Sequence, residues 1–242
     1  MAEYESAVRR TGAVSAEIDE GLRAYMTKVY TLMGVAMLIT GGVAFFVGNT
    51  PSLLVAIFNS PLKWVAMFAP LAFVFLFAAT VHKMSAATAQ IVFWAFSAVM
   101  GVSISFIFAV YTGASIAQTF FVTAIAFLSL SLYGYTTKKD LSGWGTFLIM
   151  GVIGLIIASV VNIFLQSSAL EFAVSALGVL IFAGLTAYDT QRLKNEYLHF
   201  STMGRDGMAY LEKGAIMGAL SLYLNFLNMF MFLLQFLGAA RE

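Results

Sequence analysis

The sequence predicts an all-α integral membrane protein with seven transmembrane helices, on the strength of composition and charge distribution. The chain of 242 residues is 61% hydrophobic and only 10% charged, whereas soluble domains are about 45–50% apolar and about 25% charged. Residues 84–137 and 141–170 contain no Asp, Glu, Lys or Arg, and each run exceeds the ~20 residues that cross a hydrocarbon core. A water-soluble fold could not bury so much apolar surface.

Apolar runs separated by turn-forming residues predict where the helices lie. Seven spans are expected near residues 28–48, 64–82, 88–111, 115–135, 144–165, 171–189 and 214–238. Between the first two spans, Pro51 and Pro61 bracket a segment that is too short to cross a membrane and is expected to be interfacial or re-entrant. The predicted domains are a polar cytoplasmic tail over 1–24 and a single transmembrane domain over 25–242.

Basic residues gather in alternate connections, as the positive-inside rule predicts for a membrane protein. Eleven of the 13 Lys and Arg residues fall in the N-terminal tail or in every second loop: Arg9, Arg10, Arg23, Lys28, Lys83, Lys138, Lys139, Arg192, Lys194, Arg205 and Lys213. Lys63 and Arg241 fall on the other side. This distribution places the N-terminus in the cytoplasm and favours an odd number of spans. The rival interpretation is a short last helix that re-enters.

Polar and small residues follow one stripe of the predicted last helix. At about 100° per residue, the stripe contains Gly218, Ser221, Asn225, Asn228 and Gln235. Because unsatisfied amides in hydrocarbon are costly, we expect the stripe to face the bundle interior and the last helix to be central. The amides could bond neighbouring helices or line a polar path. Gly214 and Gly218 form a GxxxG motif, and Gly151 and Gly154 thin another helix, which favours close packing.

Two acidic residues, Glu171 and Asp189, lie in the predicted sixth helix. At about 1.5 Å per residue they are roughly 27 Å apart, which places them near opposite ends of the span. Asp189 falls just before a basic loop, at the cytoplasmic boundary or slightly inside it. An acid inside a span indicates a functional site, whereas an acid at the boundary that pairs with Arg192 would be structural. Both interpretations remain open.

Three segments in a characteristic order carry a resemblance to a known family: Tyr133–Ser142, Ala187–Gln191 and Leu222–Phe226. Together they resemble the bacterial branch of the transmembrane Bax inhibitor motif family, and the similarity extends from about residue 25 to residue 238. The resemblance implies a seven-helix fold with a central last helix, in the bacterial cytoplasmic (inner) membrane.

The resemblance also implies calcium permeation. Members of the family are described as pH-sensitive calcium leak channels, gated near the cytoplasmic face by an aspartate pair on the sixth and seventh helices. Asp189 matches the first aspartate, but the second position is Asn225. Two carboxylates in contact share a proton and can change charge near physiological pH, whereas an Asp beside an Asn lacks this like-charge repulsion. Proton gating is therefore expected to be weaker here.

Carboxylate and amide oxygens still suit Ca²⁺, a hard ion, so a pathway for Ca²⁺ or another cation remains the expected function. The residues expected to form the pathway or gate are Asp189, Asn225, Asn228 and Ser221, with Asp189 and Asn225 as candidate metal ligands. The candidate charge partners are Arg192 and Lys213. No bound cofactor is expected.

Other seven-helix chemistries do not match the residue types. A retinal protein needs a lysine in the middle of its last helix, and Lys213 precedes that helix. An intramembrane serine protease needs a histidine within the membrane, and His82 and His199 fall in cytoplasmic turns. An aspartyl intramembrane protease needs a second acid that faces Asp189, and the predicted seventh helix contains none. The chain is therefore not expected to be an enzyme, and its scattered basic residues form no stripe suited to nucleic acid.

The alternative function is a regulatory membrane protein that binds and modulates other membrane proteins, such as a membrane-bound AAA protease. Some relatives within the family are associated with such a protease. The N-terminal tail offers a charged handle made of Glu3, Glu5, Arg9, Arg10, Glu17, Asp19 and Glu20. In both cases the expected surroundings are a lipid bilayer.

Overall fold

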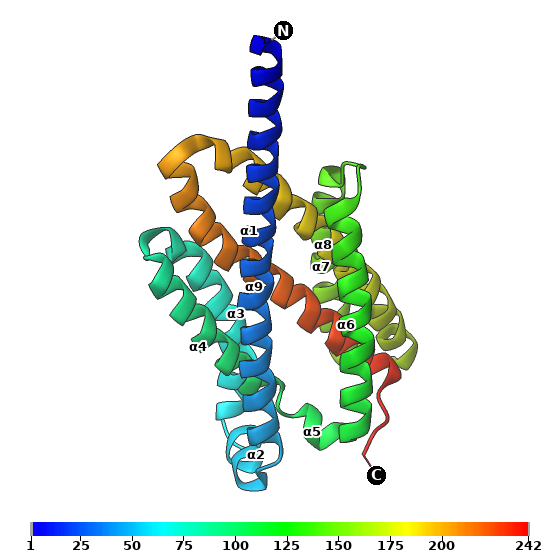
Figure 1. The fold of residues 1–242 in the computed structure, drawn as a ribbon. Helices are drawn as coiled ribbons and strands as arrows, with labels where there is room; N and C mark the ends of the chain where they lie inside the picture. The colour runs from blue at the N-terminus through cyan, green and yellow to red at the C-terminus, as the bar shows by residue number, and fades with distance from the viewer. Residues whose placement is uncertain (1, 242) are drawn as a thin grey trace.

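The computed structural model describes residues 2–241, with side chains from Ile18 onward, and its regular elements are all helices. In chain order these are α1 (Ala2–Gly48), α2 (Pro51–Phe58), α3 (Leu62–Thr80), η1 (Val81–Lys83), α4 (Ala86–Ile104), α5 (Ile107–Val110), α6 (Gly113–Thr136), α7 (Ser142–Leu165), α8 (Ser168–Phe200), η2 (Ser201–Met203) and α9 (Gly204–Leu237). Figure 1 shows the long helices as one bundle, in which α9 runs obliquely to α1.

Six stretches of the described residues are long and apolar enough to cross a membrane. They are Ile18–Gly48, Leu62–Lys83, Ala86–Val110, Gly113–Thr136, Ser142–Leu165 and Ser168–Leu237. The first five correspond to the first five predicted spans. The sixth stretch is 70 residues long and contains both α8 and α9. The prediction of an all-α membrane protein is confirmed.

The helices are longer at the polar ends than the sequence predicted. α1 is continuous from Ala2, because no proline interrupts the chain before Pro51. α8 was expected to end at Asp189 but continues to Phe200, so most of the predicted basic loop is helical. Hydropathy marks where a helix becomes polar, whereas the helix itself continues while good helix formers follow. Asp189 is therefore an interior residue of α8.

The structure breaks the third predicted span and keeps the predicted short segment between the first two spans. The third predicted span is broken, since α4 ends at Ile104 and the short α5 follows only after Ser105 and Phe106. Helix α2, at the position of the predicted interfacial or re-entrant segment, has eight residues, none of them buried. At about 1.5 Å per residue it is too short to cross a bilayer.

The helices differ sharply in how much of their surface other helices cover. α9 packs against α8, α1, α6 and α4, and its Leu222, Tyr223 and Leu234 have no exposed surface. α7 packs against α8, yet Phe147 and Phe164 on its other faces are 72% and 83% exposed. Apolar side chains so exposed along a whole helix are typical of contact with lipid.

Close contacts at glycine bring neighbouring helices together. A Cβ at Gly134 of α6 would lie 2.2 Å from the carbonyl oxygen of Ala187 in α8. A Cβ at Gly218 of α9 would lie 2.4 Å from Cδ2 of Leu193, and one at Gly151 would lie 2.9 Å from the Ile181 side chain. The packing role predicted for Gly218 and Gly151 is thus confirmed.

The packing role predicted for Gly154 is wrong, because a Cβ there would meet nothing within 4 Å. Gly214 of the GxxxG motif is intermediate, since its Cβ would lie 3.3 Å from the Tyr25 hydroxyl oxygen. Regular spacing of small residues therefore identifies a helix face that can pack closely, but the partner helix decides which of them do.

We predict that Gly134→Ala lowers the free energy of unfolding by about 1–3 kcal/mol, because the added methyl group would overlap a backbone carbonyl that cannot rotate away. The measurement is unfolding of the purified protein in detergent with increasing dodecyl sulfate. Gly154→Ala is the matched control and should be neutral or slightly stabilising. Equal losses in both variants would contradict the importance of the α6–α8 contact.

Candidate functional site between helices α8 and α9

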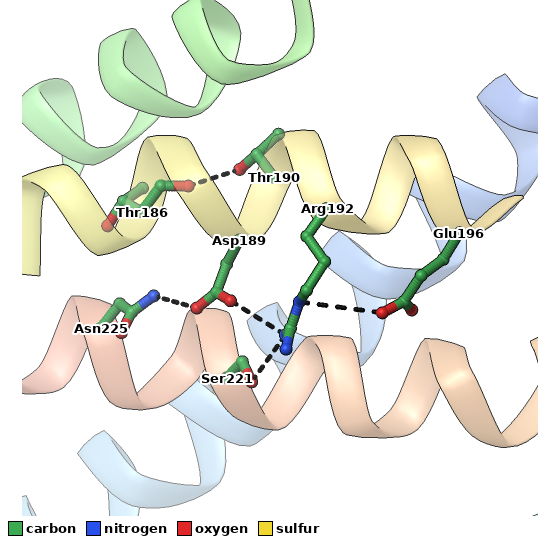
Figure 2. A network of polar contacts seen from close by, with 7 residues as sticks. All are labelled: Thr186, Asp189, Thr190, Arg192, Glu196, Ser221 and Asn225. Atoms are coloured by element: carbon green, nitrogen blue, oxygen red, sulfur yellow. Dashed lines mark hydrogen bonds and ion pairs between the residues drawn. The ribbon is translucent and has the colours of Figure 1, made fainter. Parts of the chain in front are cut away.

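The carboxylate of Asp189 is buried between α8 and α9, and each of its oxygens has a partner. Asp189 is 7% exposed. The side-chain nitrogen of Asn225 on α9 donates a hydrogen bond of 2.7 Å to Oδ2. Nη2 of Arg192, one turn further along α8, lies 2.9 Å from Oδ1 (Figure 2). A buried carboxylate with both a cationic partner and a hydrogen-bond donor has its charge balanced locally.

Arg192 connects Asp189 to two further groups. Its Nη2 donates to the Ser221 hydroxyl on α9 at 3.3 Å, and its Nε lies 3.8 Å from Oε1 of Glu196 (Figure 2). An acid, a base and an acid thus follow at positions 189, 192 and 196, on one face of α8. The guanidinium therefore lies between two carboxylates, with the shorter contact to Asp189.

Three of the polar residues of the predicted stripe on α9 bond with α8. Besides Asn225 and Ser221, Gln235 accepts a hydrogen bond of 3.0 Å from the Ser175 hydroxyl. Asn228 instead donates to the Leu224 carbonyl of its own helix at 2.8 Å. The stripe is thus a contact surface for α8 over most of its length.

Lys213 is not placed with the other predicted site residues. Its Nζ donates to the carbonyl oxygen of His82, in the short η1 that follows α3, with a distance of 3.0 Å. The charge partner of Asp189 in the structure is Arg192. The extension of α8 explains the difference, because it places Arg192 one helical turn from Asp189.

The segment Leu222–Phe226 connects α9 with two other parts of the bundle. While Asn225 bonds with α8, the hydroxyl of Tyr223 is hydrogen-bonded to Thr40 of α1 at 2.7 Å. Thr40 also donates to the Ser97 carbonyl of α4 at 2.8 Å. All these side chains are buried. The segment therefore fixes α9 against α1, α4 and α8 at one level.

Gln191 joins the segments Tyr133–Ser142 and Ala187–Gln191, and its role was missed in the sequence. Its Oε1 accepts from the Leu141 backbone N–H at 2.8 Å, and its Nε2 donates to the Lys139 carbonyl at 2.7 Å. In the same connection Ser142 donates hydrogen bonds to exposed Asp140, which hold the pKa of that carboxyl below its usual value. The α6–α7 connection is therefore held against α8.

A chain of hydroxyl groups runs from α1 through α6 to α8, and it too was missed in the sequence. Ser131 of α6 is hydrogen-bonded to Tyr30 of α1 and, at 3.0 Å, to Thr190 of α8. Thr190 in turn donates to the Thr186 carbonyl at 2.8 Å. The hydroxyls adjacent to Asp189 thus have partners of their own and leave its carboxylate to Asn225 and Arg192.

A cavity of about 270 Å³ opens beside Arg192. Residues of α8 and Ser142 line it, and the titratable side chains among them include Arg192, Glu196 and His199. Arg192 therefore both lines the cavity and contacts Asp189. Asp189 itself is not among the lining residues.

The described residues contain no cluster of three or more His, Cys, Asp or Glu side chains that could hold a metal ion tightly. Ca²⁺ usually takes about six to eight oxygen ligands. Asp189, Ser221 and, after rotation of its amide, Asn225 could supply a minority of these. The arrangement is suited to transient contact with a partly hydrated cation and not to a permanent metal site.

Comparison with known proteins identifies relatives over nearly the whole chain. Residues 22–242 match the model of a family described as inhibitor of apoptosis-promoting Bax1. The inner membrane protein YbhL of Escherichia coli is 46% identical, over 91% of this chain and 94% of that protein. An uncharacterized protein of Caulobacter vibrioides is 46% identical, over 93% and 92% of the two chains. One of Rickettsia prowazekii is 44% identical, over 93% of each.

We predict that Asn225→Leu lowers the free energy of unfolding in detergent by about 1.5–3 kcal/mol, the usual value of a hydrogen bond to a charged group. Asn228→Leu is the matched control on the same helix, and its loss should be smaller because its amide bonds only with its own backbone. If the two variants unfold alike, the Asn225–Asp189 bond contributes little to the α8–α9 contact.

Proposed function

The chain belongs to the Bax inhibitor-1 family, and on that premise we propose that it conducts Ca²⁺ across the bacterial inner membrane. The observation that carries the proposal is the buried carboxylate of Asp189, held between α8 and α9 by Asn225 and Arg192. An ionisable residue inside a membrane bundle is costly, and such residues typically mark ion pathways.

The proposed topology has seven spans, with α8 and α9 as two antiparallel ones. These helices have 33 and 34 residues, or about 50 Å each, and exceed a hydrocarbon core of about 30 Å. Both therefore extend beyond the membrane at the end that carries η2. The Lys and Arg residues of this end support a cytoplasmic position for it and for the N-terminus. The contacts of α9 with four helices support a central position.

The structure corresponds to a closed state in this proposal, because Arg192 occupies the place that a cation would take beside Asp189. A divalent cation about 4 Å from the guanidinium would be repelled by roughly 8 kcal/mol at an effective dielectric constant of about 20. Ion and guanidinium therefore cannot share the site. Glu196 already lies 3.8 Å from Nε of Arg192 and offers the guanidinium an alternative partner.

The substitution of the second acid by Asn225 changes how protons act in this proposal. A pair of carboxylates binds one proton between them because of mutual repulsion. Here a proton on Asp189 would instead remove the ion pair with Arg192. Protonation of Asp189 would then release Arg192 and would not break a shared acid pair. This supports a Ca²⁺ influx that changes only gradually with pH.

We predict that Arg192→Gln raises Ca²⁺ influx about tenfold, which corresponds to about 1.4 kcal/mol of barrier, because it removes the repelling charge. Asp189→Asn should reduce influx, and Asn225→Asp should make influx differ more between pH 6 and pH 8 by restoring an acid pair. The measurement is dye-reported Ca²⁺ uptake into liposomes that contain the purified protein.

Arg205→Gln is the matched control for charge, since Arg205 is an exposed residue at the start of α9. Its influx should equal that of the natural sequence. Influx no greater than that of empty liposomes in every variant would contradict ion conduction altogether. If Asp189→Asn leaves the influx unchanged, the protein conducts Ca²⁺ by a pathway that does not include Asp189.

A regulatory role with a membrane-bound AAA protease is the second candidate, favoured by the N-terminal part of α1, which projects beyond the other helices in Figure 1. Asp19 and Glu20 are exposed there. The other charges assigned to this handle, Glu3, Glu5, Arg9, Arg10 and Glu17, lie outside the described side chains. Deletion of residues 1–22 separates the two functions, because a conductor keeps its influx and an adaptor loses its partner in co-purification.

A further inference from the structure

A second cavity, of about 380 Å³, lies between α1 and α6 and has no part in the proposed ion pathway. Each helix contributes four residues with the spacing i, i+3, i+4, i+7, so one face of each helix lines it. The hydrogen bond between Tyr30 and Ser131, two of the lining residues, joins the two helices.

One end of the cavity is basic. Arg23 of α1 is an exposed lining residue, and Tyr135 lies in the last turn of α6. Lys194 of α8 donates to the Tyr135 carbonyl at 2.8 Å and lies 5.4 Å from the centre of its ring. The remaining lining residues are uncharged. Arg23 is thus the charged residue of the lining, and Lys194 adds a second positive charge just outside the lining, beside Tyr135.

The rest of the cavity combines apolar side chains with the hydroxyls of Thr27, Tyr30 and Ser131. Leu128 and Leu132 of α6 are each 63% exposed, and Met26 faces them from α1. From Tyr135 to Leu128 the helix rises about 10 Å, from the end of the helix toward the membrane interior. This combination matches a headgroup region followed by the first part of an acyl chain.

Two hydroxyl groups that line the cavity are compatible with an acyl chain beside them. The hydroxyls of Tyr30 and Ser131 are bonded to each other, and Ser131 is also bonded to Thr190. Because these two hydroxyls already have partners, an apolar chain beside them leaves neither of them unsatisfied.

We propose that this cavity binds one anionic phospholipid, with its phosphate at Arg23, at the end of the cavity beside Lys194, and an acyl chain along Leu128 and Leu132. Basic pockets between transmembrane helices on the cytoplasmic side are suited to anionic headgroups. A zwitterionic lipid brings its own cation to the phosphate and gains less from the two basic residues. The site uses the proposed topology but does not depend on ion conduction.

The test is native mass spectrometry of the full chain in detergent, titrated with phosphatidylglycerol or with phosphatidylcholine of the same acyl chains. We expect one phosphatidylglycerol to bind at least about fivefold more tightly than phosphatidylcholine. Arg23→Gln should weaken phosphatidylglycerol about fivefold and leave phosphatidylcholine unchanged. Leu132→Trp, which fills the groove, should weaken both lipids.

Arg205→Gln is the control, because it removes an exposed positive charge from α9 without touching the cavity. It should bind like the natural sequence. Equal affinity for the two lipids, or an Arg23→Gln variant that binds phosphatidylglycerol unchanged, would overturn the proposal. Inorganic phosphate that displaces the lipid at equal concentration would identify a site for free anions. Since the readout is binding, a failure of Ca²⁺ influx leaves this result unaffected.

Discussion

The register of α8 and α9 depends on one buried carboxylate whose charge has to be balanced inside the bundle. Asp189 receives a hydrogen bond from Asn225 and an ion pair from Arg192. Removal of either partner would leave the buried carboxylate without part of this compensation. A shift of α9 by one turn would separate all three groups. The contacts that α9 makes with α1, α4 and α6 are thereby fixed as well.

Polar groups in this bundle divide into those that bond with their own helix and those that join helices. Thr123, Thr186 and Asn228 bond with carbonyls one turn earlier in their own helices, and thus add little to the tertiary structure. Tyr223 and Asn225, two residues apart, bond with different neighbours. In lipid, where burial of apolar surface no longer favours association, bonds of the second kind and close backbone contacts select the arrangement.

The sequence predicted the membrane class, the family and the approximate helices, because apolar runs and short motifs are local properties. It could not predict that α8 continues past Asp189, since hydropathy reports polarity and not helix continuity. For the same reason it treated Lys213 as equivalent to Arg192. The contacts of Gln191 and Ser131 were missed because each partner lies at least 50 residues away along the chain. Such pairings are set by tertiary packing, which a single sequence does not record.

The bonds of Gln191 with the α6–α7 connection have a mechanical consequence. Gln191 is two residues from Asp189, and both ends of its amide are tied to the backbone at Lys139 and Leu141. A rotation of α8 that moved Asp189 away from Asn225 would therefore also move the α6–α7 connection. The buried pair is linked in this way to an exposed segment, and a fluorophore attached near Lys138 would report on an event inside the bundle.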